Sequence, residues 1–369
     1  MFQSAGAGPP SLLYKSKSLR QKAADSREQP VNIVSSALAA ASAALLLSGG
    51  AAAAQTASSG GHAGHAGHAG HATAAAARSG SHEGHRHADF ESGRFHVRID
   101  GPAQPIGDVI LIPGLTSSPE VWDMLTNALK DRYRVHRLHV QGFAGAPAED
   151  NASGPVAAPV AEDLARYIRE QRLNRPAVIG HSMGGTIGMM LAARHPGSLG
   201  RLMVVDMVPF MGAMFAQPGT PPTAESVRGA ADAIYQGMSS GPEPAYRQQA
   251  DAAIVGMIAT ESRRAGPLED SRRSDRQVAA SAFRELVVTD LRPELSRITV
   301  PVQVLYVKFN DPRMTPEITD GIYRMSYATL PGAQLTRIDD SAHFIMLDQP
   351  ERFRTAVEAF LRPQPQAAR

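Results

Sequence analysis

The sequence contains no cysteine. Disulfide bonds, catalysis by a thiol and zinc sites built from cysteine ligands are therefore excluded. A lipoprotein-type anchor is excluded as well, because it is attached through a cysteine. The missing thiols do not reveal the compartment, since a chain without cysteine is compatible with any redox environment.

The chain also lacks a dense block of one charge. Lys and Arg number 37 and Asp and Glu 35, which gives a formal net charge of +2 over 369 residues. The basic residues are mostly Arg and are scattered along the chain. We therefore expect no nucleic-acid partner and no polybasic membrane anchor.

Long apolar runs are missing too, with one shorter exception near the N-terminus. Ile33 to Leu47 is about as long as the core of a signal peptide and too short to span a bilayer comfortably. Basic residues precede this run, and an Ala-x-Ala motif at Ala52 and Ala54 follows it. We predict a targeting leader over residues 1–54 and export to the periplasm or medium, with no stable membrane anchor. The alternative is a disordered Ala-rich leader.

Histidines recur every three residues in a Gly-His-Ala repeat at His62, His65, His68 and His71. The surrounding Gly and Ala can bury little, so we predict a disordered linker over residues 55–92. Clustered imidazoles can capture Zn, Ni or Cu ions. Weak, non-catalytic metal binding is thus expected as a side property, and a main role in metal capture is the alternative.

From about Arg94 onward, β-rich runs alternate with helix-like segments. Strands are predicted over residues 94–100, 108–112, 133–140, 176–180, 201–208, 301–308 and 333–338. Helices are predicted over residues 119–130, 160–172, 316–329 and 350–361 and directly after Ser182. This alternation predicts an α/β fold, with a mostly parallel sheet covered on both faces. In such sheets, functional groups lie at the carboxyl ends of the strands.

The alternation is interrupted between about residues 209 and 296. This block is rich in Pro, Met and Ala, and it has helical patches but no clear strand. We predict an inserted helical cap within a domain that covers residues 93–362. Residues 363–369 are predicted to form a disordered tail.

The pentapeptide Gly180-His181-Ser182-Met183-Gly184 lies between a predicted strand and a predicted helix. A Gly-x-Ser-x-Gly motif in this context indicates a nucleophile elbow, a sharp turn that exposes the serine hydroxyl above the sheet. The start of the following helix also directs backbone N–H groups toward a developing oxyanion. Ser182 is therefore the candidate nucleophile.

A serine nucleophile needs a histidine base and an acid that orients it, in the chain order serine, acid, histidine. His343 follows the last predicted strand and is the candidate base. Asp311, which follows the strand at 301–308, is the first candidate for the acid. Asp206, near the end of the strand at 201–208, is the alternative, and Asp290 is a more remote one.

An oxyanion hole needs two donors. The first expected donor is the backbone N–H of Met183, next to the nucleophile. The second is the N–H of Leu115, in the turn Pro113-Gly114-Leu115 after the strand at 108–112. Gly114 permits a tight turn at this place. The alternative is that this glycine only ends the strand and has no role in an oxyanion hole.

Taken together, these motifs resemble the α/β-hydrolase superfamily from Arg94 to Leu361. The similar segments are LIPGLTSSPEVW, GFAG, GHSMGG, PVQVLYVKFNDP and DSAHFIMLDQPERF. The resemblance implies an eight-stranded, mostly parallel sheet, a cap over the site and ester-type hydrolysis without a cofactor. It assigns the nucleophile to Ser182, the base to His343, the acid to Asp311, and the oxyanion donors to Leu115 and Met183.

Two departures from the superfamily pattern stand out. Many relatives have His-Gly where this chain has Pro113-Gly114. Relatives also tend to have a glycine shortly before the acid, where this chain has Lys308-Phe309-Asn310. The second departure keeps Asp206 open as the acid. A serine nucleophile argues against haloalkane dehalogenase and epoxide hydrolase chemistry.

The sequence thus predicts a serine hydrolase that cleaves small to medium apolar carboxylic esters. Peptidase, amidase or C–C bond hydrolase activity on the same fold is the alternative, and so is a non-catalytic binding protein. Several apolar residues at the start of the cap either line an acyl pocket or pack in the core: Met207, Phe210, Met211, Met214 and Phe215.

Overall fold

The computed structural model describes residues 86–87 and 90–362, and within them eight strands form one sheet in the order β1-β2-β4-β3-β5-β6-β7-β8. The strands are β1 (Arg86–His87), β2 (Phe95–Asp100), β3 (Asp108–Ile112), β4 (Arg134–Val140), β5 (Ala177–His181), β6 (Arg201–Val205), β7 (Val302–Tyr306) and β8 (Gln334–Arg337). Strand β2 pairs antiparallel with β1 and β4, and all other neighbours are parallel. The predicted eight-stranded, mostly parallel sheet is confirmed.

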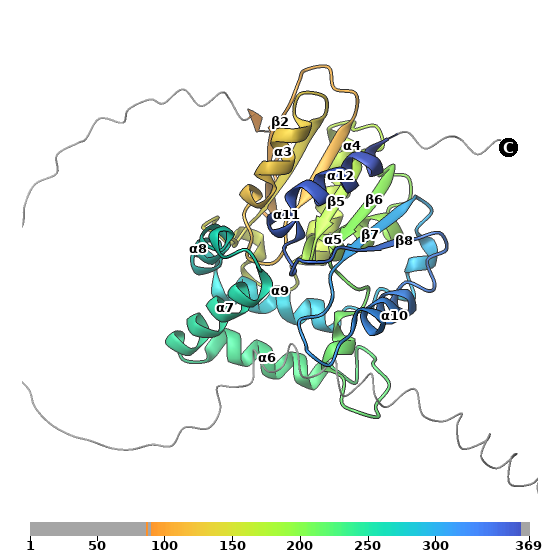
Figure 1. Ribbon diagram of the computed structural model, residues 1–369. Helices are drawn as coiled ribbons and strands as arrows, with labels where there is room; N and C mark the ends of the chain where they lie inside the picture. The colour runs from red at the N-terminus through yellow and green to blue at the C-terminus, as the bar shows by residue number, and fades with distance from the viewer. Residues whose placement is uncertain (1–85, 88–89, 363–369) are drawn as a thin grey trace, which may run out of the picture.

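Helices cover both faces of this sheet (Figure 1). Those outside the block between β6 and β7 are η1 (Pro119–Trp122), α3 (Asp123–Leu129), η2 (Glu149–Ala152), α4 (Ala157–Glu170), α5 (Met183–Arg194), α10 (Pro316–Ser326), α11 (Ile345–Asp348) and α12 (Pro350–Leu361). Successive side chains of a strand point to opposite faces. In β3, Ile110 packs in the core beneath α4 and α5, whereas Leu111 packs in the core beneath α3 and α12. A continuous apolar strand therefore serves two cores.

The block between β6 and β7 is helical and contains no strand, as predicted for the cap. Its helices are η3 (Met211–Phe215), α6 (Arg228–Ser240), α7 (Glu243–Met257), η4 (Glu261–Arg263), α8 (Ala265–Arg273), α9 (Arg276–Val288) and η5 (Leu295–Arg297). Figure 1 shows α6 to α9 gathered at one end of the strands.

Hydrogen bonds attach this cap to loops that follow three strands. The Asp270 carboxylate accepts from the N–H and hydroxyl of Ser118, after β3, at 3.0 and 2.6 Å. The N–H of Asp275 donates to the carbonyl of Gly142, after β4, at 2.7 Å. The N–H of Phe344, after β8, donates to Met257 at 3.2 Å. The cap therefore covers the carboxyl ends of the strands, where the sequence places the functional groups.

One predicted boundary is wrong. The disordered linker was expected to extend to residue 92, yet Arg86–His87 pairs with β2, and the ring of Phe90 lies 5.1 Å from that of Tyr167. A large aromatic side chain that can pack on the core gains enough from burial to order its segment. The ordered domain thus starts earlier than composition indicated.

The predicted leader (1–54), most of the linker with His62, His65, His68 and His71, and the predicted tail (363–369) lie outside the described residues. Within residues 86–87 and 90–362, no helix is long and apolar enough to cross a membrane. The same residues include no group of three His, Asp or Glu side chains that could hold a metal ion.

Candidate active site

Ser182 occupies the tight turn between β5 and α5. Its backbone is left-handed, with φ 53° and ψ −119°, a conformation that costs about 1–3 kcal/mol for a residue other than glycine. A Cβ atom on Gly180 would lie 2.1 Å from the carbonyl oxygen of Gly184, and one on Gly184 would lie 2.2 Å from that of Ile112. Only glycine fits at these two positions. The Ser182 N–H donates to Val205 at 2.9 Å, which holds the strained turn against β6.

The turn after β3 packs directly against this elbow. A Cβ atom on Gly114 would lie 3.2 Å from the Cβ of Ser182 and 3.0 Å from Nδ1 of His181. Leu115 follows Gly114 in this turn. Met183 begins α5, so its N–H has no carbonyl partner within the helix. The structure thus places both predicted oxyanion donors on segments that adjoin Ser182.

His343 lies in the loop between β8 and α11. Its Nδ1–H donates to Oδ2 of Asp206 at 2.6 Å, and its ring centroid is 4.6 Å from that of His181, the residue before Ser182. The side chains are largely enclosed, with exposed fractions of 22% for His343 and 10% for Asp206. The bond at Nδ1 fixes the tautomer and leaves Nε2 as the nitrogen that can accept a proton.

Asp206 follows β6 directly and has a left-handed φ of 52°. Its Oδ1 accepts hydrogen bonds from the N–H of Val307 at 3.1 Å and the hydroxyl of Tyr323 at 2.9 Å. With His343 on Oδ2, the carboxylate is held by donors from three separate segments. Val307 directly follows β7, so its hydrogen bond to Asp206 joins the carboxyl ends of the neighbouring strands β6 and β7.

The first candidate for the acid, Asp311, is wrong. Its carboxylate accepts from Arg313 through the backbone N–H at 2.8 Å, Nε at 3.1 Å and Nη2 at 2.7 Å. These hydrogen bonds from Arg313 lower the pKa of Asp311 to about 2. The alternative, Asp206, contacts His343 instead. The remote candidate Asp290 is also engaged elsewhere, since it pairs with Arg292 at 2.6 Å.

Sequence reasoning missed the role of His181. This side chain is fully buried, and its Nε2–H donates to the carbonyl oxygen of His343 at 3.1 Å. Burial, together with the nearby His343, holds the pKa of His181 well below its usual range, so the ring is neutral. The one sequence signal for this role was the position of His181 directly before Ser182 in the elbow motif. Tyr323 was missed as well, and a tyrosine so far along the chain gave no signal.

Aromatic residues at the start of the cap pack in the protein interior. Phe210 is 2% exposed, and the guanidinium of Arg292 stacks over its ring at 4.6 Å. Phe215 meets Phe283 of α9 edge-on at 6.1 Å. The methionines Met207, Met211 and Met214 pack on the core beneath α4 and α5. Core packing therefore accounts for the two phenylalanines.

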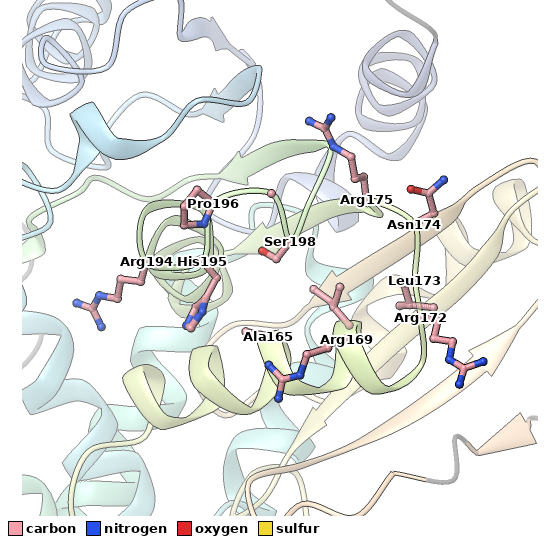
Figure 2. A pocket seen from close by; sticks show the side chains of 12 residues that line it. Ala165, Arg169, Arg172, Leu173, Asn174, Arg175, Arg194, His195, Pro196 and Ser198 are labelled. Atoms are coloured by element: carbon pink, nitrogen blue, oxygen red, sulfur yellow. The ribbon is translucent and has the colours of Figure 1, made fainter.

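A cavity of about 710 Å³ lies at the far end of β5, between the last turns of α4 and α5. Four arginines line it: Arg169, Arg172, Arg175 and Arg194. Figure 2 shows their guanidinium groups pointing in different directions, so their charges do not converge on one point. Both helices also end here, and helix C-termini carry partial negative charge. The cavity is neither next to Ser182 nor built to hold an anion.

Comparison with known proteins agrees with this architecture. The family model of the alpha/beta hydrolase family matches residues 109–356, more than half of the chain. The chain belongs to this family.

Individual relatives differ in how much of the chain they match. The provisionally named carbamate hydrolase RutD of Caulobacter sp. (strain K31) is 33% identical over 114 residues, 31% of this chain and 42% of that protein. The chain thus spans less than half the length of the carbamate hydrolases that it matches. A pimeloyl-(acyl-carrier protein) methyl ester esterase of Aeromonas hydrophila is 25% identical over 270 residues, 69% of this chain and 95% of that protein.

Among solved structures, the enol-lactonase from Burkholderia xenovorans LB400 has a TM-score of 0.59 and 22% sequence identity. The match covers 75% of this chain and 99% of that one. At this level of identity the likeness shows a shared fold.

Proposed function

We propose that this protein is a serine hydrolase that cleaves carboxylic esters of small to medium apolar substrates through an acyl-enzyme. The observation that carries the proposal is the 2.6 Å hydrogen bond from His343 to Asp206, beside the strained turn at Ser182. A histidine oriented by a carboxylate is what a serine hydroxyl needs to lose its proton. The methyl ester esterase among the similar proteins supports an ester substrate.

In this mechanism Nε2 of His343 takes the proton of Ser182 while the serine oxygen attacks the ester carbonyl. The N–H groups of Leu115 and Met183 donate to the oxyanion of the tetrahedral intermediate, and losing one such donor costs about 3–4 kcal/mol. His343 returns the proton to the leaving alcohol. Water then attacks the acyl-enzyme with His343 again as the base, the bond to the Ser182 oxygen breaks, and His343 returns the proton to Ser182 as the carboxylic acid leaves. Asp206 stabilises the imidazolium in both halves of the reaction.

The test is turnover of p-nitrophenyl esters from acetate to octanoate by the wild type and the Ser182→Ala variant. We expect Ser182→Ala to lose at least about 10⁴-fold in kcat/KM, because no other group can form the acyl-enzyme. Ser198→Ala is a suitable control. Ser198 lies just after the C-terminal end of α5, far from Ser182 along the helix, and its buried hydroxyl has no hydrogen-bond partner. An unchanged rate in Ser182→Ala would refute the assignment.

The bond type is resolved by a substrate panel. Esters, lactones, N-terminal prolyl amides and diketones should be compared at equal concentration. We expect esters to be hydrolysed fastest, because an ester carbonyl is more electrophilic than an amide carbonyl, and an alkoxide is a better leaving group than an amide anion or a carbanion. A labelling experiment with a fluorophosphonate probe separates the enzyme from a binding protein, since only an activated Ser182 reacts.

Export is a separate proposal that rests on the sequence of residues 1–54. The apolar run and the Ala-x-Ala motif support removal of a leader near Ala54. N-terminal sequencing of the protein recovered outside the cytoplasm would test it. A full-length chain retained in the cytoplasm would contradict it.

A further inference from the structure

Tyr323 of α10 contacts the acid of the proposed triad from the side opposite His343. Its hydroxyl donates to Oδ1 of Asp206 at 2.9 Å, whereas Nδ1 of His343 donates to Oδ2 at 2.6 Å. The remaining donor to Oδ1 is the backbone N–H of Val307. Tyr323 thus supplies the one donor to the carboxylate that a side-chain substitution can remove without altering His343 or the backbone.

The surroundings of Tyr323 fix this hydroxyl in place and keep it protonated. The ring stacks on Tyr306 at 4.0 Å with an interplanar angle of 20°, and on Phe309 at 5.9 Å. Burial, and secondarily the Asp206 carboxylate, raise the pKa of Tyr323 well above its usual value. The hydroxyl therefore remains a neutral hydrogen-bond donor around neutral pH.

We propose that Tyr323 is a positioning residue for catalysis, which holds the Asp206 carboxylate so that Oδ2 faces His343. This inference rests on the proposed function. Together with the Val307 N–H, which binds the same oxygen, the hydroxyl restricts rotation of the carboxylate about its Cβ–Cγ bond, so the imidazole keeps one orientation. The hydroxyl also takes up part of the carboxylate's negative charge, which weakens the attraction between Asp206 and the imidazolium form of His343.

Removing the Tyr323 hydroxyl should therefore favour protonated His343, and the acid limb of the kcat/KM profile should move to higher pH. Titratable groups that pack beside Tyr323, Asp206 and His343 include His181 of β5, Tyr306 of β7, which stacks on Tyr323, and Tyr327 just after α10. Burial keeps His181 neutral, raises the pKa of Tyr306 to about 12 and raises the pKa of Tyr327 well above its usual value. None of the three changes charge in the relevant range.

Tyr327 provides a matched control. It is also fully buried, and its hydroxyl donates at 2.6 Å to the backbone carbonyl of Met207, the residue after Asp206. Tyr327→Phe therefore removes a buried hydroxyl and its hydrogen bond in the same region but leaves the carboxylate contacts intact. Both variants should lower the melting temperature, because each leaves a buried acceptor with one donor fewer.

The experiment compares kcat, KM and the pH profile of p-nitrophenyl butyrate hydrolysis for the wild type, Tyr323→Phe and Tyr327→Phe. For Tyr323→Phe we expect a fall in kcat of about 10-fold with KM within 2-fold, and an acid limb moved up by roughly 0.3–0.5 pH units. Tyr327→Phe should keep the wild-type acid limb. Identical profiles for the two variants would overturn the proposal.

A second measurement does not depend on turnover. The proton between His343 and Asp206 should give a downfield NMR resonance, assigned by its loss in His343→Gln. We expect this resonance to move in Tyr323→Phe and to stay in place in Tyr327→Phe, and an unmoved resonance in Tyr323→Phe would also refute the positioning role. If Ser182→Ala kept full activity, the proposed function would fail, and the resonance alone would then decide whether Tyr323 positions Asp206.

Discussion

The loops after β6 and β7 lie side by side, and each contains an aspartate, but the two carboxylates have different partners. Asp206 is hydrogen-bonded to His343, Tyr323 and Val307, all more than a hundred residues away along the chain. Asp311 receives its hydrogen bonds from Arg313, two residues along the chain. The comparison teaches that a carboxylate satisfied by its own loop is not free to orient a distant histidine.

The local geometry of the two loops explains this division. Asp206 is the first residue after β6, and its N–H donates to Leu305 of β7 at 2.7 Å, so its position is set by the sheet. Asp311 is separated from the end of β7 by a longer segment that includes Lys308. The Lys308 ammonium donates to the carbonyl oxygens of Phe309 and Asp311 at 2.8 and 3.3 Å. This loop folds back on itself instead of reaching toward the elbow.

The largest expected effect comes from exchanging the two carboxylates for amides. Asp206→Asn should lower kcat/KM by about 10³–10⁴-fold, because an amide cannot stabilise the imidazolium and favours the wrong tautomer of His343. Asp311→Asn should stay within about 3-fold of the wild type. Ester hydrolysis at pH 8 measures both. Equal losses in the two variants would break the comparison, and a larger loss in Asp311→Asn would reverse it.

A smaller loss of activity is expected from removing the His181 side chain, which donates a hydrogen bond to the backbone carbonyl of His343. His181→Leu removes this donor and should lower kcat by roughly 10-fold, since the loop that carries the base loses a buried hydrogen bond. Gln places an amide nitrogen near the position of Nε2, so His181→Gln should retain more activity than His181→Leu. The kcat values of the two variants test this order. Equal kcat values would show that the hydrogen bond does not matter.

The smallest effect concerns stability at the Asp311 loop. The pKa of Asp311 is lowered to about 2 by Arg313, below the usual value of about 3.9 for an unfolded chain. Its stabilising contribution is therefore present above pH 4 and is lost as the pH falls through 2. Asp311→Asn should melt about 1 °C below the wild type at pH 7 and show a smaller difference at pH 3. A difference that grows toward low pH would contradict this sign.

Much of the fold could be predicted because its signals are local. Apolar runs such as Asp108–Ile112 are short, are bounded by turn residues and alternate with helical segments, which indicates a parallel sheet. The elbow could be predicted for the same reason, since the close contacts of Gly180 are with Gly184 and Gly185 in the same turn. The start of the domain was placed too late because composition describes a segment's average and overlooks a single residue such as Phe90.

The sequence by itself determined the α/β class, the turn that presents Ser182 and the residue types available for catalysis. These features depend on short-range sterics and side-chain periodicity, which involve residues close together along the chain. Only the tertiary structure decided that Asp206 is the aspartate that meets His343, a contact between residues 137 positions apart. Spacing along the chain could not separate Asp206 from Asp311. The choice depends on which carboxylate is already bound by its own loop and which one the packed sheet brings to the histidine.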